Sequence, residues 1–157
     1  MSETFVIREV PAERVQPLRT EVLRDWEPGR LCVYDEDEHD DTHHFAVRDQ
    51  GESVRGVVTY IRRRCPEIDD EHGYQLRGMA VAPEDQGAGL GSRLLQVSVP
   101  RLALAEPDAD ILWCNAREHV VGFYERLRFE TIGEPFEIEG VGPHVRMFRR
   151  LPTIMAG

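Results

Sequence analysis

The stretch Gln86-Gly87-Ala88-Gly89-Leu90-Gly91 carries a glycine at every second position. It follows an apolar segment that ends at Val81 and precedes leucines at helical spacing, which indicates a turn between a strand and a helix. The first turn of a helix has backbone N–H groups without partners and the positive end of the helix dipole. The stretch therefore predicts a site for a phosphate or pyrophosphate group.

Two common nucleotide-binding motifs do not fit this turn. The dinucleotide fingerprint requires a glycine where Ser92 stands, and the nucleoside-triphosphate loop requires Gly-Lys-Ser/Thr where the chain reads Gly91-Ser92-Arg93. A turn that only starts a helix, and a turn that binds another nucleotide, remain as alternatives. More of the pattern is needed to choose between them.

Apolar periodicity and turn residues predict the elements that would position this turn. In chain order they are a strand at 5–10, a helix through Val15, Leu18, Val22 and Leu23, a hairpin of strands 45–48 and 54–61, a strand at 74–81, a helix from Leu90 interrupted at Pro100, a strand at 111–115, a helix over 118–126, and strands near Thr131 and Val145. This order predicts an α/β or α+β fold with a mixed sheet and helices on both faces. The length of 157 residues and the apolar content of 41% predict a single domain over residues 1–157, with its core at about 5–150.

The glycine turn and the strand before it resemble the core motif of the Gcn5-related N-acetyltransferase (GNAT) superfamily, Gln/Arg-x-x-Gly-x-Gly/Ala. The resemblance continues at Asn115-Ala116-Arg117 and over residues 122–129, where Arg128 replaces a glycine that usually caps a helix. Residues 133–138 and 142–144 are similar to the ElaA-like branch. The resemblance implies an acyl-CoA N-acyltransferase fold with a mostly antiparallel central sheet, acetyl-CoA as cosubstrate, and no metal.

The same resemblance implies the residues that hold acetyl-CoA. The amides of residues 87–92 would hold the pyrophosphate, and the backbone of Met79 and Val81 would pair with the pantetheine arm. In the family, the strand ending at Val81 splays from the strand ending at Asn115, which opens a slot for the thioester. The expected cofactor-binding residues are Met79, Ala80, Val81, Gln86, Gly87, Ala88, Gly89, Leu90, Gly91, Ser92, Asn115 and Tyr124.

By resemblance, Tyr124 protonates the departing thiolate of coenzyme A, although it also fits a core position on its helix. A protonated amine cannot attack a thioester, so a base must accept a proton from the acceptor. The base candidates are His144, His44 and Glu71, and we expect His144 to be the base. The alternative for His144 is an ordinary hydrogen-bonded histidine at the surface. Cys114 lies inside an apolar strand and is not expected to be a nucleophile.

The segment 35–41 is almost entirely acidic and is expected to form a solvated loop, with recognition of a cationic substrate as the alternative. The histidines in and after it, at 39, 43 and 44, lack metal-ligand spacing, so no metal site is predicted. Cys32, Cys65 and Cys114 have no paired spacing and are expected to be reduced and buried.

The formal charge of −10 repels phosphate backbones and argues against nucleic-acid binding. No apolar run approaches a membrane span and no signal core begins the chain, so we expect a cytoplasmic protein without a membrane partner. A homodimer is left open. The first functional hypothesis is direct transfer of the acetyl group to a primary amine in a ternary complex, and the alternative is a non-catalytic acyl-CoA-binding or sensing module of the same fold.

Overall fold

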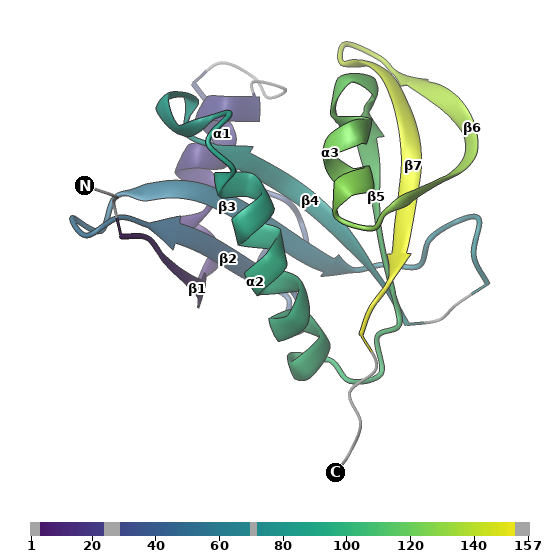
Figure 1. Ribbon diagram of the computed structural model, residues 1–157, viewed down its shortest axis with the longest axis horizontal. Coiled ribbons are helices and arrows are strands. Elements are labelled where there is room, and N and C mark those ends of the chain that lie inside the picture. Colours follow the sequence, from purple (N-terminus) through teal and green to yellow (C-terminus); the bar gives the residue numbers. More distant parts are fainter. Residues whose placement is uncertain (1–3, 24–28, 70–71, 153–157) are drawn as a thin grey trace. The chain divides into compact units, whose positions relative to one another are not determined.

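The computed structural model describes residues 4–23, 29–69 and 72–152 (Figure 1). Contacts group the chain into two compact units, one of residues 1–61 with 77–98 and one of residues 62–76 with 99–157. The first unit contains the predicted glycine turn, and the second contains Asn115, Tyr124 and His144. The prediction of one domain stays a prediction.

The predicted strands and helices all appear, with small shifts at their ends. The strands are Val6–Val10 (β1), His43–Arg48 (β2), Val54–Arg62 (β3), Gly73–Val81 (β4), Ile111–Arg117 (β5), Glu130–Ile138 (β6) and Gly142–Arg150 (β7). The α-helices are Gln16–Leu23 (α1), Leu90–Ala105 (α2) and Val121–Arg126 (α3), and the 3-10 turns are Ala12–Arg14, Pro83–Asp85 and Glu118–Val120 (η1 to η3).

The strands form a mixed sheet in the order β1-β2-β3-β4-β5-β7-β6. β1 with β2, β2 with β3, β5 with β7 and β6 with β7 are antiparallel, while β4 and β5 run parallel. The first half of β4 belongs to the second unit and its second half to the first unit. The predicted mixed, mostly antiparallel sheet is confirmed.

In the first unit, α1 and α2 cover opposite faces of the sheet. Leu18 of α1 packs in one core cluster with Val57 of β3. The residue before Val57 is Gly56, and a Cβ added there would lie 3.8 Å from Leu94 of α2. Successive residues of a strand point to opposite faces, so the predicted helices on both faces are confirmed within this unit.

The sequence predicts that the second helix kinks or restarts at Pro100, and the restart is wrong. α2 continues as one helix from Leu90 to Ala105. Proline removes the hydrogen bond to the carbonyl four residues earlier, which belongs to Gln96. Gln96 and Pro100 are both exposed, so water can satisfy that carbonyl and the helix continues.

The acidic segment 35–41 does not form a wholly solvated loop, which corrects the expectation from its charge. Asp37 is only 4% exposed and pairs with Arg19 of α1, which is fully buried. The acidic residues of segment 35–41 were expected to repel one another, but Arg19, which is distant in sequence, neutralises Asp37. The nearby Asp35 and Glu38 are exposed, as expected.

The second unit packs around Cys65, Ile111 and Trp113, and the indole N–H of Trp113 donates to the carbonyl of Arg63 at 2.7 Å. α3 ends as the resemblance implied, because Arg128 takes the left-handed conformation with φ of 73°. The N–H of Phe129 donates to Tyr124 O at 3.1 Å, as in a Schellman cap. Arg128 therefore occupies a position that favours glycine.

Arg128→Gly is expected to raise the free energy of unfolding by about 0.5 to 1 kcal/mol, because a side chain in the left-handed region is strained. Urea denaturation followed by circular dichroism measures the change. Arg126→Gly is the matched control and is expected to lower stability by about 1 kcal/mol, because Arg126 lies inside α3. Equal effects at both positions would contradict the strain at Arg128.

Candidate functional site

The glycine turn between β4 and α2 has the backbone of a ligand-binding loop. Gly87 and Gly89 have φ of 84° and 83°, and a Cβ added at either would meet no atom within 4 Å. The side chain of Gln86 donates to the carbonyl of Val81 at 3.0 Å, which ties the turn to the end of β4. Residues 86–89 are exposed, so the turn is accessible to a ligand.

The start of α2 presents a run of unused donors. Among residues 4–23, 29–69 and 72–152, no hydrogen-bond acceptor is found for the backbone N–H groups of Gly87, Gly89, Leu90, Gly91 and Ser92. These donors and the helix dipole together favour an anion at this point. The backbone has the features that pyrophosphate binding requires.

β4 leads into this turn with an irregular backbone. Gly78 has φ of 61°, and a Cβ there would lie 2.8 Å from Nε of Arg19, so the position requires glycine. Ala80 is buried in the core beside α1, which leaves only its backbone for a ligand. Met79 and Val81 are partly buried.

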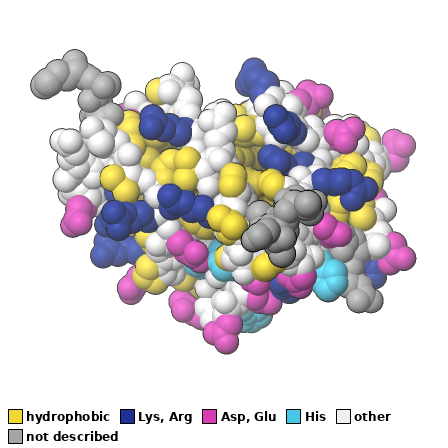
Figure 2. Space-filling model, turned by 60° about the horizontal axis from the view of Figure 1, so that its bottom comes forward, with side chains coloured by type: hydrophobic (Ala, Val, Ile, Leu, Met, Phe, Trp, Pro, Cys, Tyr) yellow, Lys and Arg dark blue, Asp and Glu magenta, His cyan; other side chains and the backbone are white. Residues whose placement is uncertain are grey.

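Arginines balance the acidic side chains locally, which matters for anion binding in a chain with formal charge −10. In the first unit, Arg55 pairs with Asp49 at 2.9 Å and with Asp85 at 2.6 Å. Figure 2 shows one face of the molecule, where arginine, acidic and apolar side chains are interspersed. The negative charge is therefore not spread evenly over the surface, so the backbone N–H donors of the glycine turn can attract a phosphate.

In the second unit, Tyr124 lies on α3 and is 8% exposed, with Phe123 and Phe129 in edge contacts 5.1 and 5.2 Å away between ring centroids. These contacts fix the orientation of the ring. Asn115 is partly buried in β5 between the buried Cys114 and Ala116, and its Oδ1 accepts a hydrogen bond from Nε of Arg146 at 3.1 Å.

Arg146 was not expected from the sequence. It pairs with Glu67, and its guanidinium lies 5.4 Å from the ring of Trp113 and 5.1 Å from the ring of Phe136. The alternation of β7 could have placed Arg146 on the same face as His144, but the partner residues lie too far away in sequence to foresee. Arg146 fixes the side-chain amide of Asn115.

His144 is buried rather than at the surface, and it lines a hollow of about 450 Å³ with Glu118, Thr131, Gly133, Pro135 and Val145. Its Nδ1–H donates to the carbonyl of Gly142 at 2.8 Å, which leaves the lone pair on Nε2 when the ring is neutral. The ring also stacks on Phe136, with 5.9 Å between centroids. His144 therefore has the tautomer that a base requires.

Both ring nitrogens of His44 form hydrogen bonds within the fold. Nε2–H donates to the carbonyl of Asp37 at 2.9 Å, and Nδ1 accepts from the hydroxyl of Thr59 at 2.8 Å. Burial lowers the pKa of His44, so the ring stays neutral. Both ring nitrogens are used, which leaves no lone pair for a substrate. Glu71, also considered as a base, lies outside the described residues.

The three cysteines are free and buried, as expected. Burial raises the pKa of the Cys114 thiol far above its usual value, which keeps it protonated and unsuited to nucleophilic attack. Within residues 4–23, 29–69 and 72–152, no cluster of histidine, cysteine and acidic side chains has the arrangement of a metal site. No helix in that part of the chain has the length and hydrophobicity to cross a membrane.

Comparisons with known proteins agree with this geometry. A family model described as an acetyltransferase (GNAT) domain matches residues 29–151. YitI of Bacillus subtilis (strain 168), named as an uncharacterized N-acetyltransferase, is 31% identical over 147 residues, which are 94% of this chain and 97% of YitI.

Solved structures share the fold at low sequence identity. Escherichia coli ElaA has a TM-score of 0.74 and 15% identity, over 93% of this chain and 99% of its own. An aminoglycoside 6'-N-acetyltransferase complexed with coenzyme A has a TM-score of 0.70 and 14% identity, over 96% of this chain and 99% of its own. The chain therefore belongs to the GNAT acetyltransferase family and is an acetyl-CoA-dependent acyltransferase.

Proposed function

We propose that this acyltransferase moves the acetyl group of acetyl-CoA directly to a primary amine of a small-molecule or peptide acceptor in a ternary complex. The observation that carries the proposal is the run of unused N–H donors from Gly87 to Ser92 at the start of α2. The pyrophosphate of acetyl-CoA binds these donors, and the pantetheine arm pairs with the backbone of Met79 and Val81.

In the transfer step, the amine nitrogen attacks the thioester carbonyl carbon and the C–S bond then breaks. His144 Nε2 accepts a proton from the amine, and the hydroxyl of Tyr124 gives a proton to the leaving thiolate. The tautomer of His144 and its place in a hollow with Glu118 support the first role. No acyl-enzyme forms, because the Cys114 thiol is buried and protonated.

The test is release of free coenzyme A thiol from acetyl-CoA in the presence of a panel of primary amines. Turnover with at least one amine, and retention of that turnover by Cys114→Ala, are expected. Binding of acetyl-CoA without turnover on every amine would favour the sensing module. Loss of most activity in Cys114→Ala would contradict direct transfer.

Gly89→Ala is expected to weaken acetyl-CoA binding about tenfold or more, because a left-handed backbone is strained with a side chain and the loop donors shift. Isothermal titration calorimetry measures the affinity. Gly29→Ala is the matched control, since Gly29 also has positive φ, at 82°, and open space around its Cβ. The affinity of Gly29→Ala for acetyl-CoA should be unchanged. Equal losses of affinity in both variants would contradict acetyl-CoA binding at the glycine turn.

A further inference from the structure

Two guanidinium groups lie over the ring of Tyr34 in the first unit. The guanidinium carbon of Arg19 is 4.0 Å from the ring centroid, and that of Arg77 is 4.1 Å from it. Tyr34 belongs to the segment between α1 and β2, whereas Arg77 lies in β4. The stack thus links that segment to the strand that precedes the glycine turn.

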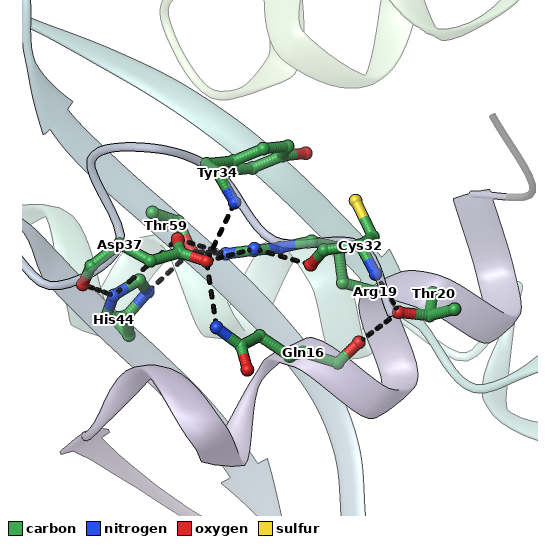
Figure 3. Close-up of polar contacts among 8 residues, drawn as sticks. All are labelled: Gln16, Arg19, Thr20, Cys32, Tyr34, Asp37, His44 and Thr59. Carbon is green, nitrogen blue, oxygen red and sulfur yellow. Dashed lines mark hydrogen bonds and ion pairs between the residues drawn. The ribbon is translucent and has the colours of Figure 1, made fainter. Parts of the chain in front are cut away.

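A buried network holds Tyr34 in place (Figure 3). Arg19 donates to both carboxylate oxygens of Asp37, at 2.8 and 3.1 Å, and to the hydroxyl of Thr59 at 2.7 Å. Asp37 also accepts from Gln16 at 3.0 Å and from the backbone N–H of Tyr34 at 3.0 Å. These contacts fix Arg19 and Asp37, and Tyr34 contacts both of them.

The charges in this cluster do not cancel. Asp37 neutralises Arg19, while burial keeps His44 neutral by lowering its pKa. Burial also raises the pKa of Tyr34 to about 12, so its hydroxyl is neutral as well. Arg77 is left with a positive charge that nothing in the cluster offsets.

Arg77 differs from the other partly buried arginines that form ion pairs. Arg55, Arg62 and Arg146 all pair with carboxylates. For Arg77, the described parts of the chain provide the contact with Tyr34 but no carboxylate and no hydrogen-bond acceptor. Arg77 is partly buried, and its guanidinium lies over a ring with its donors unused, so it is suited to bind a planar anion in a bidentate manner.

The place of Arg77 in β4 relates it to the transferred group. It stands two residues before Met79, whose backbone is proposed to pair with the pantetheine arm. Two residues of strand span at most about 7 Å, and the left-handed Gly78 between them shortens that span. A carboxylate bound by Arg77 would hold an acceptor within reach of the thioester.

We propose that Arg77 and Tyr34 form a carboxylate-binding subsite, so that the acceptors of this enzyme are primary amines that also carry a carboxylate, as amino acids do. This inference rests on the proposed function. Arg77 contacts the acceptor, Tyr34 orients the guanidinium, and the pair of Arg19 and Asp37 positions Tyr34.

The test compares amines that carry or lack the carboxylate, namely glycine, leucine and phenylalanine against their primary amides, at a pH where the α-amines of both series are largely neutral. For wild-type protein, kcat/KM measured by thiol release should be at least about tenfold higher for the carboxylates, as expected for a charge-assisted hydrogen-bond pair. Arg77→Gln should remove this preference by raising KM for the carboxylates about tenfold, with a much smaller change in KM for the amides.

Two further variants separate recognition from a structural effect. Arg77→Glu should reverse the preference and accept a diamine better than an amino acid, which damage to the fold would not produce. Arg8→Gln is the matched control, because Arg8 is an exposed arginine of β1 in the same unit. It should keep the wild-type preference.

A binding measurement distinguishes failure of the subsite from failure of the proposed function. Thermal stabilisation by N-acetylglycine and by N-acetylglycinamide, both product analogues, is compared in wild type and Arg77→Gln. Turnover of carboxylates and amides at equal rates overturns the subsite but leaves the transferase intact. Stabilisation by the carboxylate alone, without turnover on any amine, supports the subsite and overturns the proposed transfer. If the protein shows neither turnover of any amine nor stabilisation by N-acetylglycine, both the subsite and the proposed transfer are overturned.

Discussion

Asp37→Ala is expected to lower the free energy of unfolding by about 3 to 5 kcal/mol. The substitution leaves the guanidinium of Arg19 charged and fully buried, with only the hydroxyl of Thr59 and the carbonyl of Cys32 as acceptors. Nε of Arg19 already lacks a partner in the described structure, so no spare acceptor stands nearby. Urea denaturation followed by tryptophan fluorescence and circular dichroism measures the loss.

The controls for this prediction come from the same acidic segment. Asp35→Ala removes the same group from an exposed position and should change stability by less than about 0.5 kcal/mol. The double variant Arg19→Met with Asp37→Leu removes both charges and should recover most of the loss, because apolar pairs often replace buried ion pairs without penalty. A loss below about 1 kcal/mol in Asp37→Ala would contradict the buried pair.

The glycine turn was predictable because its backbone conformation depends on local properties. The conformations of Gly87 and Gly89, and the unused amides at the start of α2, follow from residues adjacent in sequence. The sequence marked Arg128 as the residue that replaces a helix-capping glycine, and a helix cap is also a local structure. Motif and residue type were sufficient in these cases.

The surroundings of Asp37 could not be predicted, because burial depends on partners that only the fold supplies. Arg19 lies eighteen positions earlier in the sequence, and Thr59 comes from β3. A series of acidic residues is predicted to be solvated when only the residues adjacent in sequence are considered. The environment of His144 was missed in the same way, since Gly133 and Pro135 of β6 close its hollow.

The substitution Tyr124→Phe is expected to lower kcat by about 100-fold or more, because general acid catalysis by a positioned side chain contributes about that much. Phenylalanine keeps the edge contacts with Phe123 and Phe129, so the fold and the orientation of the ring should persist. The affinity for acetyl-CoA should also persist, since the pyrophosphate donors lie elsewhere. Steady-state kinetics of thiol release and calorimetric titration of acetyl-CoA separate the two effects.

Tyr74→Phe is the matched control for the loss of a hydroxyl. Tyr74 is another buried tyrosine of the second unit, and its hydroxyl donates to Glu106 at 3.1 Å. Its loss should lower stability by about 1 kcal/mol and leave kcat unchanged, because no role in proton transfer is proposed for it. If Tyr124→Phe keeps kcat within twofold of wild type, Tyr124 is a core residue and the thiolate takes its proton from water. The hydroxyl of Tyr124 is assigned as the general acid only if kcat falls in Tyr124→Phe and not in Tyr74→Phe.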